Sequence, residues 1–263
     1  MNSSPIIVFD SGIGSMSIIK GLRKELPNEN LIYFADKANF PYGTKSQNDL
    51  LKIVHNTISY LERFKPKLII VASTTPTMQL IDKITSLTDI PLIGVRPPFD
   101  KAVKMTKTKH IAILATESTI NSDELDKQIK THIPQDIFIS KYNASPLISL
   151  IEDGTFLRNR KKIEKLILQI LGKMNNIDIT ILASTHLPFI GDQLNMLYPN
   201  TKFIDPSMII ANEVKIFLTK NNLHNKNKKS KMRILVTDNK KEFEEILRQL
   251  GRREKIEEVF WAI

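Results

Sequence analysis

The 263-residue sequence contains no cysteine. This absence excludes disulfide bonds, thiolate metal sites and cysteine nucleophiles. No apolar run reaches the roughly 18 to 20 residues that a membrane-spanning helix needs. The amino-terminal sequence MNSSPIIVFD lacks the basic region and the small residues of a cleaved leader. We therefore expect a protein that stays in the cytoplasm and does not enter a membrane.

Metal-binding patterns are also absent from the sequence. None of the five histidines has zinc-site spacing to another histidine or to a carboxylate, so we expect no metal centre. These histidines are His55, His110, His132, His186 and His224.

The net charge of +10 is concentrated in one short tract, residues 220–233, which holds six cations and no carboxylate. Such a tract can bind nucleic acid. Its Asn/Lys composition between a helix-like and a strand-like segment favours a solvated loop, and we expect no nucleic-acid partner. The six cations are Lys220, Lys226, Lys228, Lys229, Lys231 and Arg233.

Short apolar runs alternate with amphipathic stretches along the chain, which predicts an α/β protein with mostly parallel sheets flanked by helices. Prolines 97 and 98 suit a crossover between two lobes, because proline continues neither a helix interior nor a central strand. We expect one lobe over residues 1–95 plus 206–263 and the other over 96–205. The predicted strands are residues 5–9, 31–35, 67–72 and 91–95, then 110–115, 136–141, 178–183 and 202–205.

Two of these predicted strands end in nearly the same sequence motif, VASTTP at 71–76 and LASTHLP at 182–188. Each has hydroxyl residues before a proline that suits the first turn of a helix. Ligands of open parallel sheets bind beyond the carboxyl ends of the strands. A cleft between two equivalent lobes would then place Ser73 and Ser184 opposite each other.

Five ordered segments carry a resemblance to a known family. The first, at 6–46, contains FDSG and PYGTKS; it is followed by VASTTP, NASPLISLIEDG (143–154), ILASTHLPFI (181–190) and RILVTDNKKEFEEILRQLG (233–251). Together they resemble the glutamate racemases of the cofactor-independent aspartate/glutamate racemase family. The resemblance implies two pseudosymmetric α/β lobes, no cofactor, a small acidic amino acid as ligand and a possible homodimer. The family role is the supply of D-glutamate for peptidoglycan precursors.

In that family two cysteines face each other across the substrate α-carbon, and the resemblance carries these positions to Ser73 and Ser184. A serine hydroxyl has a pKa roughly five units above that of a thiol, so its alkoxide costs about 7 kcal/mol more to form. That difference corresponds to about five powers of ten in rate. Serine acts when a base takes its proton, and His186 lies two residues beyond Ser184. No comparable base adjoins Ser73 in the sequence.

The remaining matched positions are implied by the resemblance to bind substrate or to support proton transfer. Asp10, Glu152 and His186 are the supporting catalytic groups. Departures from the family include Thr74 for asparagine, Ser15 for glycine, Lys37 for threonine and Ser145 for a third cysteine. The substrate-binding positions are Asp10, Ser11, Tyr42, Gly43, Thr74, Thr75, Thr116, Thr119, Thr185 and His186.

Each supporting residue also has a purely structural interpretation. Asp10 suits the N-cap of the helix that follows, Glu152 suits the end of a helix, and His186 suits a structural histidine. Two functions therefore stay open. One is a racemase with two serines as weak proton-transfer groups, and the other is a non-catalytic descendant that binds an acidic ligand or acts through a surface. The serines fit either drift after loss of activity or deliberate removal of cysteine, and the change at Thr74 favours drift.

Overall fold

The computed structural model describes residues 2–227 and 229–260. Within this range the chain divides into two compact units. Unit 1 joins the chain up to Val95 with the chain from Ser207 onward, and unit 2 is Arg96–Pro206. The division at Val95 falls just before the two prolines of the predicted crossover.

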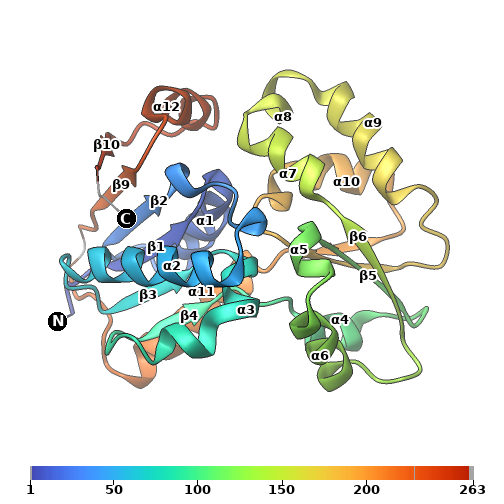
Figure 1. The fold of residues 1–263 in the computed structure, drawn as a ribbon, viewed down its shortest axis with the longest axis horizontal. Coiled ribbons are helices and arrows are strands. Elements are labelled where there is room, and N and C mark those ends of the chain that lie inside the picture. Colours follow the sequence, from blue (N-terminus) through green and yellow to red (C-terminus); the bar gives the residue numbers. More distant parts are fainter. Residues whose placement is uncertain (1, 228, 261–263) are drawn as a thin grey trace. The chain divides into compact units, whose positions relative to one another are not determined.

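Unit 1 is built on a six-stranded sheet with the strand order β10-β9-β2-β1-β3-β4. Every pairing in this sheet is parallel (Figure 1). The strands are β1 (Ile6–Asp10), β2 (Leu31–Ala35), β3 (Leu68–Val71), β4 (Leu92–Gly94), β9 (Met232–Val236) and β10 (Ile256–Glu258).

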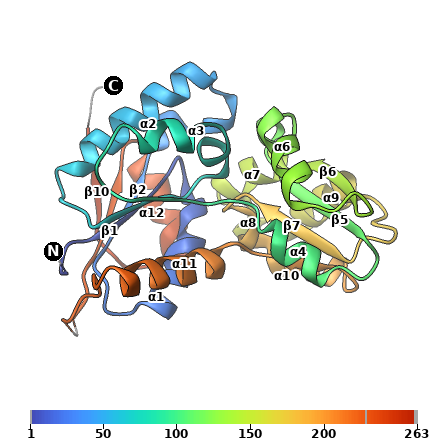
Figure 2. The same cartoon turned by 90° about the horizontal axis from the view of Figure 1, so that it is seen from below.

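Helices cover both faces of this sheet, which is why its central strands read as continuous apolar runs. Figure 2 shows α2 and α3 on one side of the sheet and α1 and α11 on the other. The elements between the strands are η1 (Ile13–Ser15), α1 (Met16–Glu25), η2 (Lys37–Asn39), η3 (Tyr42–Thr44), α2 (Gln47–Glu62), α3 (Thr74–Thr85), α11 (Ser207–Lys220) and α12 (Lys240–Gln249).

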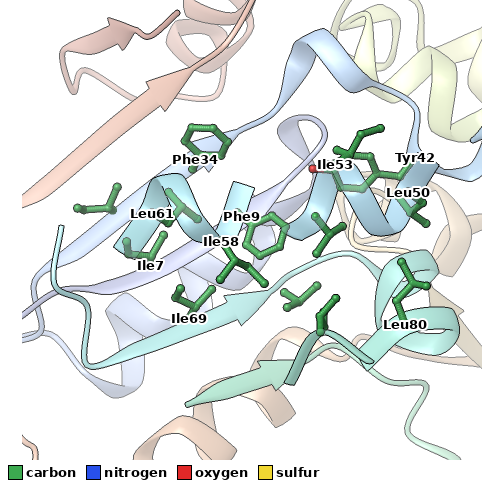
Figure 3. Packing of buried hydrophobic residues seen from close by; sticks show 14 of the residues in the cluster. Ile7, Phe9, Phe34, Tyr42, Leu50, Ile53, Ile58, Leu61, Ile69 and Leu80 are labelled. Carbon is green, nitrogen blue, oxygen red and sulfur yellow. The ribbon is translucent and has the colours of Figure 1, made fainter. Parts of the chain in front are cut away.

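The face under α2 and α3 holds a hydrophobic cluster to which alternate strand residues contribute (Figure 3). Ile7 and Phe9 of β1 and Ile69 of β3 meet Ile58 and Leu61 of α2 there. All five side chains are essentially inaccessible to solvent. Burial of one such side chain contributes about 1.5–3 kcal/mol to folding. The cluster therefore holds β1 and β3 in register, so that their carboxyl ends lie next to each other.

Unit 2 contains a four-stranded parallel sheet with the order β6-β5-β7-β8. Figure 1 shows α7, α9 and α10 above this sheet and α4 and α6 below it. The strands are β5 (His110–Ala115), β6 (Phe138–Asn143), β7 (Ile179–Ala183) and β8 (Lys202–Ile204). The helices are α4 (Phe99–Met105), α5 (Glu117–Ile120), α6 (Asp123–His132), α7 (Ser145–Glu152), α8 (Thr155–Arg158), α9 (Arg160–Leu171), η4 (Leu187–Ile190) and α10 (Gly191–Leu197).

The two sheets share one topology. Numbered from the first strand of each unit, both contain the order 2-1-3-4, and unit 1 adds β9 and β10 beyond its second strand. The predicted α/β class with two parallel sheets flanked by helices is confirmed. The alternation was also predicted, and the stretch between β5 and β6 forms two helices, α5 and α6, rather than one. Ser122 causes the break, because its side chain caps α6 by accepting from the Leu125 amide.

The basic tract starts at Lys220, the last residue of α11, and ends at Arg233 in β9, while its described residues 221–227 and 229–231 form no helix or strand. Lys228 lies outside the described residues. A buried ion pair between Lys67 and Glu29 anchors the start of this loop, because Lys67 also donates to the Leu223 carbonyl and Glu29 accepts from the Asn225 amide. The predicted loop is confirmed for residues 221–227 and 229–231, but Lys220 belongs to α11 and Arg233 to β9. In the parts of the chain that the structure describes, every helix is too short or too polar to span a membrane.

Candidate functional site

The first group of predicted site residues lies where the strands of unit 1 end. Asp10 is the last residue of β1, and Ser73 follows β3, its neighbour in the sheet. The parallel register pairs Phe9 with Val71, and the Ala72 amide donates to the Phe9 carbonyl at 2.9 Å. Asp10 and Ser73 therefore emerge side by side from the carboxyl edge of the sheet.

Asp10 is 2% exposed, and its Oδ1 accepts from the Ser11 amide at 2.7 Å. The N-cap residue of η1 is Gly12 and that of α1 is Ser15. The N-cap interpretation of Asp10 is therefore wrong. Its carboxylate instead holds the first peptide of the loop that leaves β1, which keeps a buried acid at the strand end.

Ser73 is the N-cap residue of α3, with extended backbone, but its hydroxyl makes no capping bond. It is half-buried, whereas Thr74 and Thr75 in the first turn are 5% and 4% exposed. Within the described part of the chain, the buried Thr74 Oγ1 has no hydrogen-bond partner. Hydroxyls at the amino terminus of a helix, where amide donors and the positive end of the helix dipole meet, suit an anionic ligand.

Tyr42 and Gly43 lie in η3, in the loop between β2 and α2. The Tyr42 side chain belongs to the hydrophobic cluster and is 2% exposed. Its hydroxyl donates to Asp36 Oδ2 at 2.9 Å. Burial, followed by the nearby Asp36 carboxylate, raises the pKa of Tyr42 far above its ordinary value, and Asp10 adds to the rise. The Tyr42 side chain thus anchors this loop to the core, while Gly43 is half-buried.

Asp36 was missing from the predicted site. It follows β2, is inaccessible to solvent, and accepts from Asn39, Tyr42 and Thr237. Its amide donates to the Asp10 carbonyl at 2.7 Å. Burial raises the pKa of Asp36, although its three donors act in the opposite direction. The sequence could have indicated Asp36 by its position, because it directly follows an apolar predicted strand, as Asp10 does.

The second group lies at the carboxyl edge of the sheet in unit 2. Ser184 follows β7 and is 6% exposed. Its Oγ accepts from the His186 backbone amide at 3.4 Å. His186 Nε2 lies 2.8 Å from Glu152 Oε2, and both side chains are about 95% buried. Glu152 ends α7 as its helix-end interpretation predicts, and its side chain joins α7 to the Ser184 turn.

This arrangement defines what each residue of the second group can do. Glu152 orients the His186 imidazole by accepting or donating at Nε2. The amide of His186 points a donor at Ser184 Oγ, which favours a negative charge on that oxygen. The sequence predicted a histidine base beside Ser184, and the observed link between the two residues is this backbone amide.

Three further predicted residues, Thr116, Thr119 and Thr185, also belong to this edge. Thr116 caps α5, its Oγ1 accepting from the Thr119 amide and donating to Thr119 Oγ1 at 2.9 Å. Thr119 and Thr185 are 1% and 3% exposed. Ser145, at the start of α7, accepts from the Glu117 amide at 2.9 Å. The structure therefore gathers the predicted residues into two sets, one at the strand ends of each unit.

Comparison with known proteins agrees with these motifs. The family model described as Asp/Glu/Hydantoin racemase matches residues 14–214. A glutamate racemase of Haemophilus influenzae is 31% identical over 230 residues, which cover 85% of this chain and 84% of the relative. One from Limosilactobacillus reuteri is 31% identical over 92% of this chain and 91% of its own length.

Solved structures give the same result. The glutamate racemase of Francisella tularensis in complex with D-glutamate has 30% identity and a TM-score of 0.86, covering 99% of this chain and 98% of that one. A glutamate racemase isoform of Bacillus anthracis has 25% identity and a TM-score of 0.89, covering 98% of each chain. The family model spans more than half of the sequence, and these relatives span most of it. The chain therefore belongs to the Asp/Glu/hydantoin racemase family.

Proposed function

We propose that this chain binds glutamate and interconverts its two enantiomers slowly, by two-base proton transfer without a cofactor. Ser73 and Ser184 are the proton-transfer groups of this proposal. The single observation that carries it is the repeated strand end. In both sheets the third strand runs directly into an Ala-Ser-Thr turn at the carboxyl edge. A two-base racemase needs such a pair, because one group removes the α-proton and the other delivers a proton to the opposite face.

Recognition of an acidic amino acid is supported by the first turn of α3. A buried hydroxyl without a partner costs about 1–3 kcal/mol, and Thr74 Oγ1 is such a hydroxyl in the described residues. A carboxylate or ammonium group of a ligand would satisfy it. Asp10 supplies a buried carboxylate at the neighbouring strand end, suited to an amino group. The relatives named glutamate racemase, and the Francisella tularensis complex with D-glutamate, support glutamate as that ligand.

The proton-transfer step uses an alkoxide on one serine and a neutral hydroxyl on the other. The alkoxide takes the α-proton, the electron pair stays on the α-carbon, and the opposite hydroxyl returns a proton to it. Asp10 assists Ser73, whereas Ser184 is assisted by the His186 amide and by the imidazole that Glu152 holds. The higher pKa of a hydroxyl costs about 7 kcal/mol relative to a thiol. The proposed enzyme is therefore slower than a dithiol counterpart by up to about five powers of ten.

The family role places this reaction in the supply of D-glutamate for peptidoglycan precursors. On this proposal the remaining substrate contacts come from Ser11, the Tyr42-Gly43 loop, Thr75, Thr116, Thr119 and Thr185. The protein acts in the cytoplasm, with a small acidic amino acid as its ligand. It forms a homodimer, and nucleic acid is not among its partners.

A second candidate function is binding without turnover. The observation that favours it concerns His186. Its imidazole Nε2 is hydrogen-bonded to Glu152, and its backbone amide is the group that contacts Ser184 Oγ. A serine hydroxyl held by a backbone amide, which takes no proton from it, is a weak nucleophile and a weak acid. Such a protein would bind glutamate without converting it.

Two measurements on the same preparation separate these functions. Isothermal titration with D- and L-glutamate tests binding, and NMR in heavy water follows exchange of the α-proton. The control is the Ser73→Ala, Ser184→Ala double variant, which removes both hydroxyls and reveals any contaminating host racemase. Binding with exchange that disappears in the control supports the racemase, and binding with no exchange supports the second function. No binding and no exchange would reject both.

A further inference from the structure

In unit 1, one buried side chain outside the predicted site links the loop after Asp10 to the turn that carries Ser73. Ser15 is inaccessible to solvent and lies at the start of α1. Its hydroxyl donates to the Ala72 carbonyl at 3.2 Å, across 57 positions of the sequence. Ala72 directly precedes Ser73. The bond therefore ties the loop that follows Asp10 to the turn that carries Ser73.

This hydrogen bond differs from an ordinary helix cap. Ser15 is the N-cap residue of α1, but its side chain makes no capping bond. A cap hydroxyl would accept from an amide within its own helix, whereas Ser15 donates to another strand end. The neighbouring Ser17 provides the contrast, since its hydroxyl donates locally to the Gly14 carbonyl at 2.9 Å.

The accepting carbonyl controls the geometry of Ser73. The Ala72 carbonyl and the Ser73 amide belong to one planar trans peptide, so fixing the carbonyl also fixes the direction of the amide. The preceding peptide is already held, because the Val71 carbonyl accepts from the Val95 amide and from Thr77 Oγ1. Ser15 therefore fixes the orientation of the Ala72–Ser73 peptide, directly before the chain enters α3.

The donor end of the bond is equally well anchored. The Tyr33 hydroxyl donates to the Gly12 carbonyl, in the same loop as Ser15. Tyr33 is inaccessible to solvent, and its ring lies 6.1 Å from that of Phe243. The loop between Asp10 and α1 is thus fixed to β2, and Ser15 transmits this position to the β3–α3 turn.

We infer that Ser15 is a positioning residue, which holds Ser73 and the first turn of α3 at a fixed place relative to Asp10. Its importance for ligand binding rests on the proposed function. Its effect on the turn does not, because the hydrogen bond exists within the protein itself. Loss of a neutral hydrogen bond of about 1 kcal/mol changes an equilibrium about fivefold.

Hydrogen–deuterium exchange of the ligand-free protein tests the inference directly. Ser15→Ala and Ser15→Gly both remove the hydroxyl, and Ser17→Ala removes a neighbouring hydroxyl as the matched control. We expect the amides of residues 73–78 other than Pro76, which has no amide hydrogen, to exchange about fivefold faster in both Ser15 variants than in the Ser17 control. Exchange in β7 and η4 of unit 2 should stay unchanged. Unaltered exchange at 73–78, or a uniform increase throughout unit 1, would overturn the inference.

The affinity for D-glutamate supplies the second readout. We expect the dissociation constant to rise about fivefold in Ser15→Ala and to stay unchanged in Ser17→Ala. Faster exchange at 73–78 with an unchanged dissociation constant would overturn the role of Ser15 in ligand binding. If the unmodified protein binds no glutamate, the proposed function fails while the exchange experiment still decides the inference.

Discussion

The two units share the strand order 2-1-3-4 but surround their equivalent serines differently. Ser73 is half-buried at the amino terminus of the twelve-residue helix α3. Ser184 is buried before the short helix η4 and accepts from the His186 amide. Equal topology thus places two hydroxyls equivalently, while local packing gives them different neighbours. The two serines that we propose as proton-transfer groups are therefore supported in different ways.

Two buried carboxylates, one in each unit, show the same contrast. In unit 2 the buried Glu152 is bonded to an imidazole that belongs to the serine turn itself. In unit 1 the buried Asp36 is bonded to Asn39, Tyr42 and Thr237, which hold the loop beyond β2 and the end of β9. One carboxylate therefore acts within the turn, and the other acts on the loop beside it.

The largest change in stability is expected from breaking the pair in unit 2. His186→Ala leaves the buried Glu152 without its imidazole, so the free energy of unfolding should fall by about 2–4 kcal/mol. The matched control is His132→Ala, in the same unit, because His132 contacts the exposed Asp100. That variant should lose less than about 1 kcal/mol. Urea unfolding measures both, and equal losses would contradict the assigned role of the buried pair.

An intermediate effect, dependent on pH, is expected from Asp36 in unit 1. Because the pKa of Asp36 is raised in the folded protein, the unfolded chain ionises first as the pH increases. The contribution of Asp36 to stability is therefore complete below the ordinary aspartate pKa and declines up to the raised value. Asp36→Asn removes this titration.

The difference in unfolding free energy between the unmodified protein and Asp36→Asn should thus decrease across that pH window and be constant above it. Thermal or urea unfolding at a series of pH values measures the difference. An increase with pH would mean that hydrogen bonds to the ionised carboxylate outweigh its burial.

The smallest effect comes from the two unpartnered threonine hydroxyls, one in each unit. Thr74 and Thr180 both have a buried Oγ1 without a partner in the described residues. Replacing either by valine keeps the shape and should stabilise the ligand-free protein by about 1 kcal/mol. Only Thr74→Val should weaken glutamate binding, because Thr180 lies within β7. Thermal denaturation with and without glutamate measures both effects, and equal affinities in the two variants would exclude Thr74 from the ligand site.

Much of this architecture was predictable because buried parallel strands appear as short apolar runs. The strand β2 lies at the residues predicted for it, and β6 begins two residues later than predicted. The strand β10 was missed, since Ile-Glu-Glu at the edge of a sheet carries almost no hydrophobic signal. Its place is fixed by parallel pairing with β9 rather than by its own composition.

Sequence motifs identified the individual residues of the candidate site, whereas contacts between residues far apart in the sequence required the structure. The repeated Ala-Ser-Thr turns marked Ser73 and Ser184 from the sequence alone. The bond between Ser15 and Ala72 and the bond between Thr237 and Asp36 join residues 57 and 201 positions apart. Such contacts depend on sheet order, which no local pattern encodes.

The most direct test of proton transfer by Ser73 and Ser184 is α-proton exchange measured by NMR in heavy water, with D- and L-glutamate as substrates. The unmodified protein is compared with the Ser73→Cys, Ser184→Cys double variant. We predict slow exchange of both enantiomers by the unmodified protein, and exchange faster by up to about five powers of ten in the double variant. Absence of exchange in both proteins, despite intact folding, would contradict a glutamate site at the two serine turns.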